Sequence, residues 1–97
     1  MSSSELSPAQ RVATQRVQRL PIDPSARMGR VVRRLRDEQG VSQEDLAEAA
    51  RLDRTFISML ERGRQRATLE TALALAQALG VTLTELAREI EAETVEQ

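Results

Sequence analysis

Apolar residues recur at helical spacing in five separate stretches of the chain. Within each stretch they lie mostly three or four positions apart, which places them on one face of an α-helix. The stripes comprise Met28, Val32 and Leu35; Leu46, Ala47 and Ala50; Phe56, Ile57 and Leu60; Leu69, Ala72, Leu75, Ala76 and Leu79; and Val81, Leu83, Leu86 and Ile90. We therefore predict an all-α fold in which these stripes form one shared core.

Capping residues divide these stretches into five helices. Glycines follow three of the helical runs, where a left-handed residue commonly ends a helix, namely Gly40, Gly63 and Gly80. N-cap residue types precede the runs at Asp23, which is followed by Pro24, and at Ser42, Asp53, Thr68 and Thr82. Ser42 with Asp45, and Thr82 with Glu85, have capping-box spacing. The predicted helices cover about 24–39, 43–50, 54–62, 69–79 and 83–92.

Residues 1–20 form an N-terminal extension to the predicted five-helix domain at 21–92, and 93–97 form an acidic tail. Ser2 to Ser4 are expected to be disordered, whereas Ser7 and Pro8 can begin a further helix. Apolar residues then fall on one side of it, at Ala9, Val12, Ala13, Val17 and Leu20. We expect a surface helix with a structural role; packing on the domain, dimerisation and a basic arm along DNA are the options.

The composition argues against an enzyme. The 97 residues suffice for one domain and include one Phe, no Trp and no Tyr, so the core must be aliphatic. Cysteine and histidine are both absent, which removes the usual nucleophile–base pairs and zinc ligands. We therefore expect no catalytic residues, no metal and no cofactor. No apolar run is long enough to cross a bilayer, so we expect a cytoplasmic protein without a membrane partner.

The charges are segregated along the chain, although the net charge is only −1. Residues 1–66 hold 13 Arg and 9 acidic residues, a balance of +4, whereas 67–97 hold one Arg and 6 acidic residues, a balance of −5. A basic front and an acidic back would orient such a molecule on a polyanion. The alternative interpretation is a solvated basic face with an acidic tail.

The stretch SQEDLAEAARLDRTFISMLERG at 42–63 has the pattern of a helix-turn-helix. Two short helices meet at a tight turn near Arg51, and the small Ala47 lies where the helices must approach closely. Apolar residues fill the space between them at Leu46, Ala50, Leu52, Ile57 and Leu60. This spacing leaves the outer face of the second helix free to enter a DNA major groove.

The same stretch resembles the lambda-repressor-like, Xre-type (Cro-type) helix-turn-helix regulators. The resemblance extends from about Met28 to Leu86 and includes MGRVVRRLRDEQGVSQEDLA, DRTFISMLERG and LALAQALGVTLTEL. It is closest to the controller proteins of restriction–modification systems, in which a similar RT-aromatic-IS run begins the recognition helix. Arg51 stands where the family usually has a glycine, which implies a strained turn. Gln65, Arg66 and Ala67 replace a common Arg-Asn-Pro.

The resemblance implies roles for individual residues in binding double-stranded DNA. Base contacts are expected from the recognition helix at 54–62, through Arg54, Thr55, Ser58 and Met59. Contacts to the DNA backbone are expected from Gln43, Arg62, Arg64 and Arg66. Arg33 and Arg34 are expected to face solvent, and Arg34 is also a candidate for a position close to DNA. For Gln43, for Met59 and for the arginines at 62, 64 and 66, ordinary exposure on a helix or loop is the alternative.

The resemblance also implies a structural ion pair between Arg36 and Glu61, which ties the first helix to the recognition helix. A homodimer is expected through the acidic C-terminal third, where the apolar residues exceed what one short helix needs. The candidate interface residues are Leu73, Leu83, Leu86, Ala87 and Ile90. Closure of the monomer core is the competing interpretation for Leu86 and Ile90.

The favoured function is a sequence-specific transcriptional regulator, a repressor or autoregulator that binds a pseudo-palindromic operator as a homodimer. The alternative is an antitoxin or another protein-interaction module that carries a helix-turn-helix and binds a protein partner through residues 1–20. An enzyme is disfavoured, since no nucleophile–base pair, metal cluster or phosphate loop can be found in the sequence.

Overall fold

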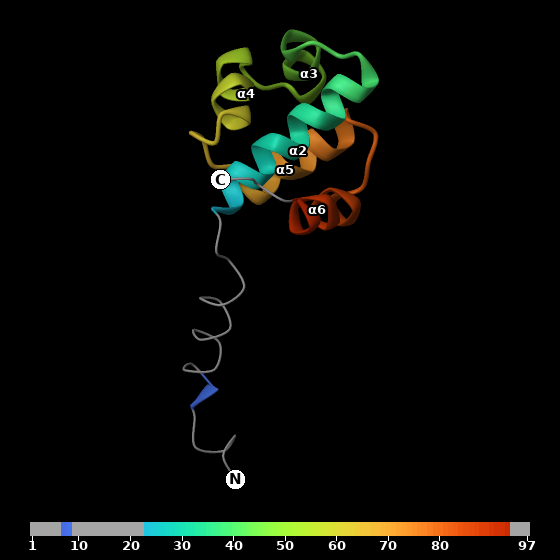
Figure 1. Cartoon of the computed structure of the whole chain (residues 1–97). Helices are drawn as coiled ribbons and strands as arrows, with labels where there is room; N and C mark the ends of the chain where they lie inside the picture. The colour runs from blue at the N-terminus through green and yellow to red at the C-terminus, as the bar shows by residue number, and fades with distance from the viewer. Residues whose placement is uncertain (1–6, 9–22, 94–97) are drawn as a thin grey trace.

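Five helices follow one another in the computed structural model, which describes residues 7–8 and 23–93 (Figure 1). The expected N-terminal helix and the C-terminal end of the acidic tail, 94–97, lie outside the described residues. The helices are α2 (Pro24–Gln39), α3 (Gln43–Ala50), α4 (Arg54–Glu61), α5 (Leu69–Ala78) and α6 (Leu83–Ala92). The predicted all-α fold is confirmed, and the predicted bounds differ from the observed ones by one residue at the ends of α4 and α5.

Local capping interactions explain why the boundaries were predictable. The Ser42 and Asp45 pair forms a reciprocal capping box at the start of α3, and Thr82 and Glu85 do the same at α6. Gly40 adopts the left-handed conformation that ends α2. Arg51 adopts it as well, with φ of 60°, and is the one non-glycine residue of the described chain with positive φ. The strained turn expected at Arg51 is therefore present.

The core lies where all five helices meet. α2 contacts α4 and α6, α3 contacts α4 and α5, and α5 contacts α6. The fully enclosed large side chains come from every helix and are Val31, Val32, Leu46, Ile57, Leu60, Leu75 and Leu86. Two details of the expected stripes are wrong. Val31, which the first stripe left out, is buried, whereas Leu69, which the fourth stripe included, is 73% exposed.

Gly29 sits inside α2 and allows α4 to pack directly against it. A Cβ atom at this position would overlap the backbone carbonyl oxygen of Leu60 and would lie 3.0 Å from that of Glu61. Both neighbours are backbone atoms at the end of α4, so no side-chain rotation can relieve the contact. Sequence reasoning missed this residue, although a glycine in the interior of a helical run commonly marks a close packing contact.

We predict that Gly29→Ala destabilises the fold by about 2 kcal/mol. Helix propensity alone would favour the alanine by about 1 kcal/mol, so the two arguments differ in sign. Chemical denaturation of both proteins measures the difference. Gly40→Ala is the control, because nothing lies within 4 Å of a Cβ there and only the left-handed backbone conformation is strained. A Gly29→Ala protein more stable than wild type would contradict the packing argument.

Candidate nucleic-acid interface

The exposed side of α4 brings together the residues expected to contact bases. Asp53 caps the helix, and its carboxylate accepts a hydrogen bond of 2.8 Å from the backbone N–H of Thr55. Arg54 and Thr55 are exposed in the first turn, while Ser58 and Met59 are half-buried one turn further along. Ile57 and Leu60 are fully buried on the opposite side. One face of α4 is thus held in the core and the other is free.

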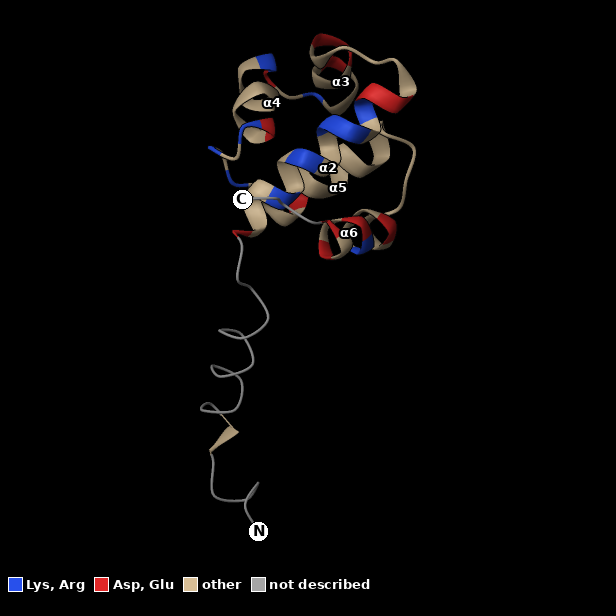
Figure 2. Cartoon of the chain, viewed as in Figure 1, with Lys and Arg blue, Asp and Glu red and all other residues tan. Residues whose placement is uncertain are grey.

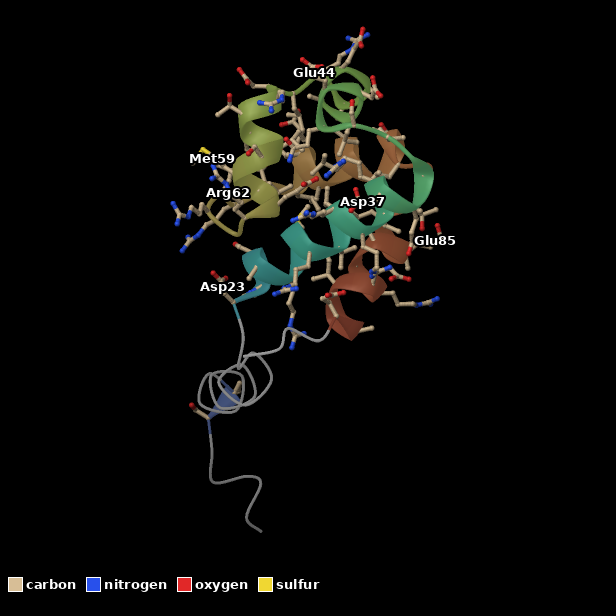
Figure 3. The ribbon with its side chains drawn as sticks, turned by 45° about the horizontal axis from the view of Figure 1, so that its top comes forward. Asp23, Asp37, Glu44, Met59, Arg62 and Glu85 are labelled. Atoms are coloured by element: carbon tan, nitrogen blue, oxygen red, sulfur yellow. The ribbon has the colours of Figure 1, made fainter. Side chains whose placement is uncertain are left out.

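The chain after α4 carries a run of exposed arginines. Arg62, Arg64 and Arg66 are all exposed, and within the described residues none of them, nor Arg54, forms an ion pair. In Figure 3 Met59 and Arg62 lie at one edge of the molecule, and Glu85 lies at the opposite edge. Figure 2 shows basic residues along α2, α4 and the following segment, and acidic residues along α6. Basic residues therefore gather on α2 and around α4, while acidic residues lie on α6 and also on α3, which contacts α4.

A buried ion pair connects α2 to the end of α4, as expected. The Arg36 guanidinium donates to both carboxylate oxygens of Glu61, from Nε at 2.8 Å and from Nη2 at 3.0 Å. A third donor of the same guanidinium reaches the carbonyl oxygen of Val41 at 2.9 Å. The two charged side chains are only 11% and 4% exposed. Hydrogen bonding to Glu61 raises the pKa of Arg36 above its ordinary value, against the effect of burial, so the guanidinium stays charged.

Gln43 belongs to this same network. Its amide Nε2 donates a hydrogen bond of 3.0 Å to Glu61, so the first residue of α3 is tied to the last residue of α4. Sequence reasoning placed Gln43 at the DNA backbone but missed its contact with Glu61. The amide nitrogen retains a second N–H, so the observed bond leaves one donor for another partner.

The side chain of Arg34 is 39% exposed, and its guanidinium also contacts α6, which sequence reasoning missed; a position of Arg34 close to DNA stays a prediction. Its Nη2 contacts Glu89 at 2.8 Å and Glu93 at 3.4 Å. The hydrogen bond to Glu89 is the main reason why the pKa of Arg34 is raised. Arg27 reinforces this contact between helices by donating to the carbonyl oxygen of Glu91 at 3.2 Å. Arg33, by contrast, is exposed as expected and lies 3.8 Å from Asp37 on the same helix.

The candidate dimer residues divide into three groups. Leu86 is completely buried within the single chain, so it offers no surface to a second copy, and we withdraw it from the interface. Leu83 and Ile90 are half-buried and pack against the core. Ala87 is exposed, as is Leu73, which is 43% exposed. Leu69, which was assigned to the core, adds to the exposed apolar surface of α5.

No candidate metal centre accompanies these surfaces in the described part of the chain. Within 7–8 and 23–93, no group of His, Cys, Asp and Glu side chains could hold a metal ion. None of the helices there is long and apolar enough to cross a bilayer.

Comparison with known proteins identifies the family. Residues 32–86 match the family model described as helix-turn-helix. The chain is 38% identical over 72 residues to the control protein C.MunI of Mycoplasma sp, a match that covers 73% of this chain and 97% of that protein. It is 40% identical over 60 residues to the HTH-type transcriptional regulator DdrOP3 of Deinococcus deserti, covering 62% of this chain and 46% of that longer relative.

A solved structure gives the same result. The restriction–modification controller protein C.Esp1396I, a tetramer in complex with its natural 35 base-pair operator, superposes with a TM-score of 0.63. Its sequence is 33% identical, and the match covers 71% of this chain and 96% of that one. The matched family model, the controller-protein relatives and the free outer face of α4 agree. The chain therefore belongs to the helix-turn-helix family of DNA-binding transcription regulators.

Proposed function

We propose that this protein regulates transcription, as a repressor or autoregulator, by binding a pseudo-palindromic operator as a homodimer with α4 in the major groove. The observation that carries the proposal is the outer face of α4, which presents exposed Arg54 and Thr55 while its inner face is fixed in the core. Residues 21–92 would form the DNA-binding domain. The controller protein C.Esp1396I, which occupies its operator as a tetramer, supports this assignment by similarity.

Side chains in the first two turns of α4 would read the base sequence of the operator. Arg54 can donate two hydrogen bonds to the O6 and N7 atoms of a guanine, and Thr55 offers both a hydroxyl and a methyl group. Ser58 and Met59 lie one turn later, where the thioether can contact a thymine methyl group. The fixed inner face of α4 would keep these four side chains in one register with the bases.

Contacts to the DNA backbone would come from Gln43 at the start of α3 and from the arginines that follow α4. Gln43 can use its second amide N–H, together with the N-terminus of α3, to hold a phosphate. Arg62, Arg64 and Arg66 would neutralise phosphates without reading sequence. Glu44, Asp45 and Glu48 make the outer side of α3 acidic, so the DNA would approach from the side of α4 and the arginines.

A homodimer would form through the exposed apolar surface of α5 and α6. Leu73 and Ala87 are the exposed members of the interface, and Leu83 and Ile90 contribute their uncovered parts. Leu69 lies one turn before Leu73 and extends the same apolar stripe on α5. Burial of such side chains against a second copy would remove the largest exposed apolar groups of the described chain from water.

We predict that Leu73→Glu or Ala87→Glu weakens the dimer at least about tenfold, a change of about 1.4 kcal/mol. Both side chains are exposed in the single chain, so the substitutions introduce charge at the interface without disturbing the core. Sedimentation equilibrium over a range of concentrations measures the dissociation constant. Ala49→Glu, at an exposed position on α3, is the matched control. Equal dissociation constants for all variants would place the interface elsewhere.

Selection of bound sites from random duplex DNA tests the proposed function. Two α4 helices related by a two-fold axis would lie about 34 Å apart, one DNA turn, so the selected sequence should contain two matching half-sites at that spacing. Titration of the selected duplex then gives the stoichiometry. Recovery of sequences without any enriched motif would contradict sequence-specific binding.

A further inference from the structure

A hollow on the surface of α2 borders the interface described above and shares Arg62 with it. Arg30 and Arg33 on α2, Arg62 and Gly63 in the turn after α4, and Glu93 after α6 all line it. The hollow thus runs along the exposed side of α2, between the end of the recognition helix and the end of α6.

Four acidic residues, Asp37, Glu38, Glu61 and Glu93, also line the hollow, and each lies within 4.0 Å of an arginine, whereas some of the basic groups are free. Glu61 is paired with Arg36, and Glu93 is paired with Arg34. Arg30 and Arg62 form no ion pair within the described residues, and Arg33 has only a contact of 3.8 Å with Asp37 in which both side chains are more than 60% exposed. Such an exposed pair contributes little and exchanges readily for another anion.

The packing of α2 against α4 places these free arginines beside the proposed DNA interface. Gly29 contacts the backbone at the end of α4, and a Cβ at Gly63 would lie 3.5 Å from the Cβ of Ala26. Arg30 follows Gly29 directly, and Arg33 lies one helical turn further along α2. Arg62, at the end of the proposed DNA interface, and Arg30 and Arg33 on α2 therefore line the same hollow.

We propose that Arg30 and Arg33, together with Arg62, bind the phosphates of the DNA strand that passes the end of α4. This inference rests on the proposed function and adds a second backbone-binding surface to it, which lies on α2 and adjoins Arg62, a residue already assigned to phosphates. Guanidinium groups suit phosphate oxygens because they donate two parallel hydrogen bonds and remain charged. The contacts fix the position of the protein on DNA and carry no base preference.

Affinity measured against salt concentration tests the number of phosphate contacts. Each phosphate contact releases counterions and contributes about 0.9 to the steepness with which log affinity falls against log salt concentration. In a symmetric dimer Arg30→Gln removes one contact from each subunit, so the steepness should decrease by about 2. The wild-type affinity divided by the variant affinity should then fall about twelvefold when the salt concentration is raised from about 50 to about 200 mM. Arg33→Gln should behave in the same way, and Asp37→Asn should strengthen binding by freeing Arg33.

A scan with methylphosphonates identifies the phosphates concerned. Each phosphate of the selected operator is replaced in turn by a neutral methylphosphonate, and affinity is measured for wild type, for Arg30→Gln and for Arg33→Gln. We expect one or two positions in each half-site where neutralisation weakens the wild type but no longer affects the variant. Arg88→Gln, which removes an exposed arginine of α6, should retain the full wild-type pattern.

The outcomes separate this inference from the function on which it rests. If the wild type selects no operator, the proposed function itself fails. If it selects an operator but the α2 variants keep the wild-type salt slope and the wild-type methylphosphonate pattern, only the second phosphate surface is overturned. A change in base preference caused by Arg30→Gln or Arg33→Gln would also overturn it, because phosphate contacts carry no sequence information.

Discussion

Arg54→Ala should weaken binding to the selected operator by about 1–3 kcal/mol per half-site, which amounts to about 2–6 kcal/mol for the dimer. The reason is the loss of a two-bond contact to one guanine in each half-site, while the rest of the interface is unchanged. Preference should relax at that base pair alone. Because Arg54 is exposed and forms no ion pair in the described chain, its removal should leave the fold intact.

The loop arginines provide the contrast for this experiment. Arg64→Ala and Arg66→Ala should weaken all sequences almost equally and make binding less dependent on salt. Affinity for the operator and for its single-base variants, measured at several salt concentrations, separates the two behaviours. A uniform loss for Arg54→Ala combined with altered base preference for Arg64→Ala would mean that α4 does not lie in the groove as proposed.

Glu61→Ala should destabilise the folded protein by about 3 kcal/mol. The substitution leaves the Arg36 guanidinium, which is 11% exposed, without its bidentate partner, and only the Val41 carbonyl and Asp37, 3.4 Å from Nη1, remain as partners. It also removes the acceptor of the Gln43 amide. Three helices lose a shared contact at once, and DNA binding should fall together with stability because this contact fixes the end of α4.

A double-mutant cycle measures how much of that loss is the pair itself. Each single substitution, Arg36→Met or Glu61→Leu, leaves one charged side chain without its partner. The combined variant leaves no unpaired charge, so its loss of unfolding free energy should be smaller than the sum of the two single losses. Denaturant unfolding of the four proteins gives the coupling free energy. Gln43→Ala is the control, since it removes one hydrogen bond from a neutral amide to the Glu61 carboxylate, leaves the ion pair in place and should cost about 1.5 kcal/mol. Additive losses would show that the pair is not coupled.

The helix boundaries could be predicted because they depend on residues that are close in sequence. The capping box of Ser42 and Asp45 joins atoms three residues apart, and Gly40 ends α2 through its own backbone conformation. The apolar stripes likewise repeat every three or four residues. Such signals are complete within a single helix, so the order of the five helices and the free face of α4 follow from the sequence alone.

Family resemblance supplied what local patterns could not. The pairing of Arg36 with Glu61 joins residues 25 positions apart, and no periodicity in the sequence relates them. For Arg34 the resemblance did not supply the partners. Its guanidinium lies within 4.0 Å of Glu38 on its own helix and of Glu89 and Glu93 near the end of the chain. Which of many possible partners an arginine meets depends on how the helices are packed.

The tertiary structure alone decided which apolar residues are buried and which glycine is indispensable. Leu69 and Leu86 both lie at helical core spacing, yet Leu69 is 73% exposed and Leu86 is not exposed at all. Gly29 lies inside α2 and Gly40 ends it. An added Cβ atom would collide with the backbone of α4 at Gly29, whereas nothing lies within 4 Å of one at Gly40. Spacing specifies the direction in which a side chain points along its own helix, but burial requires a neighbour, and neighbours are set by long-range packing.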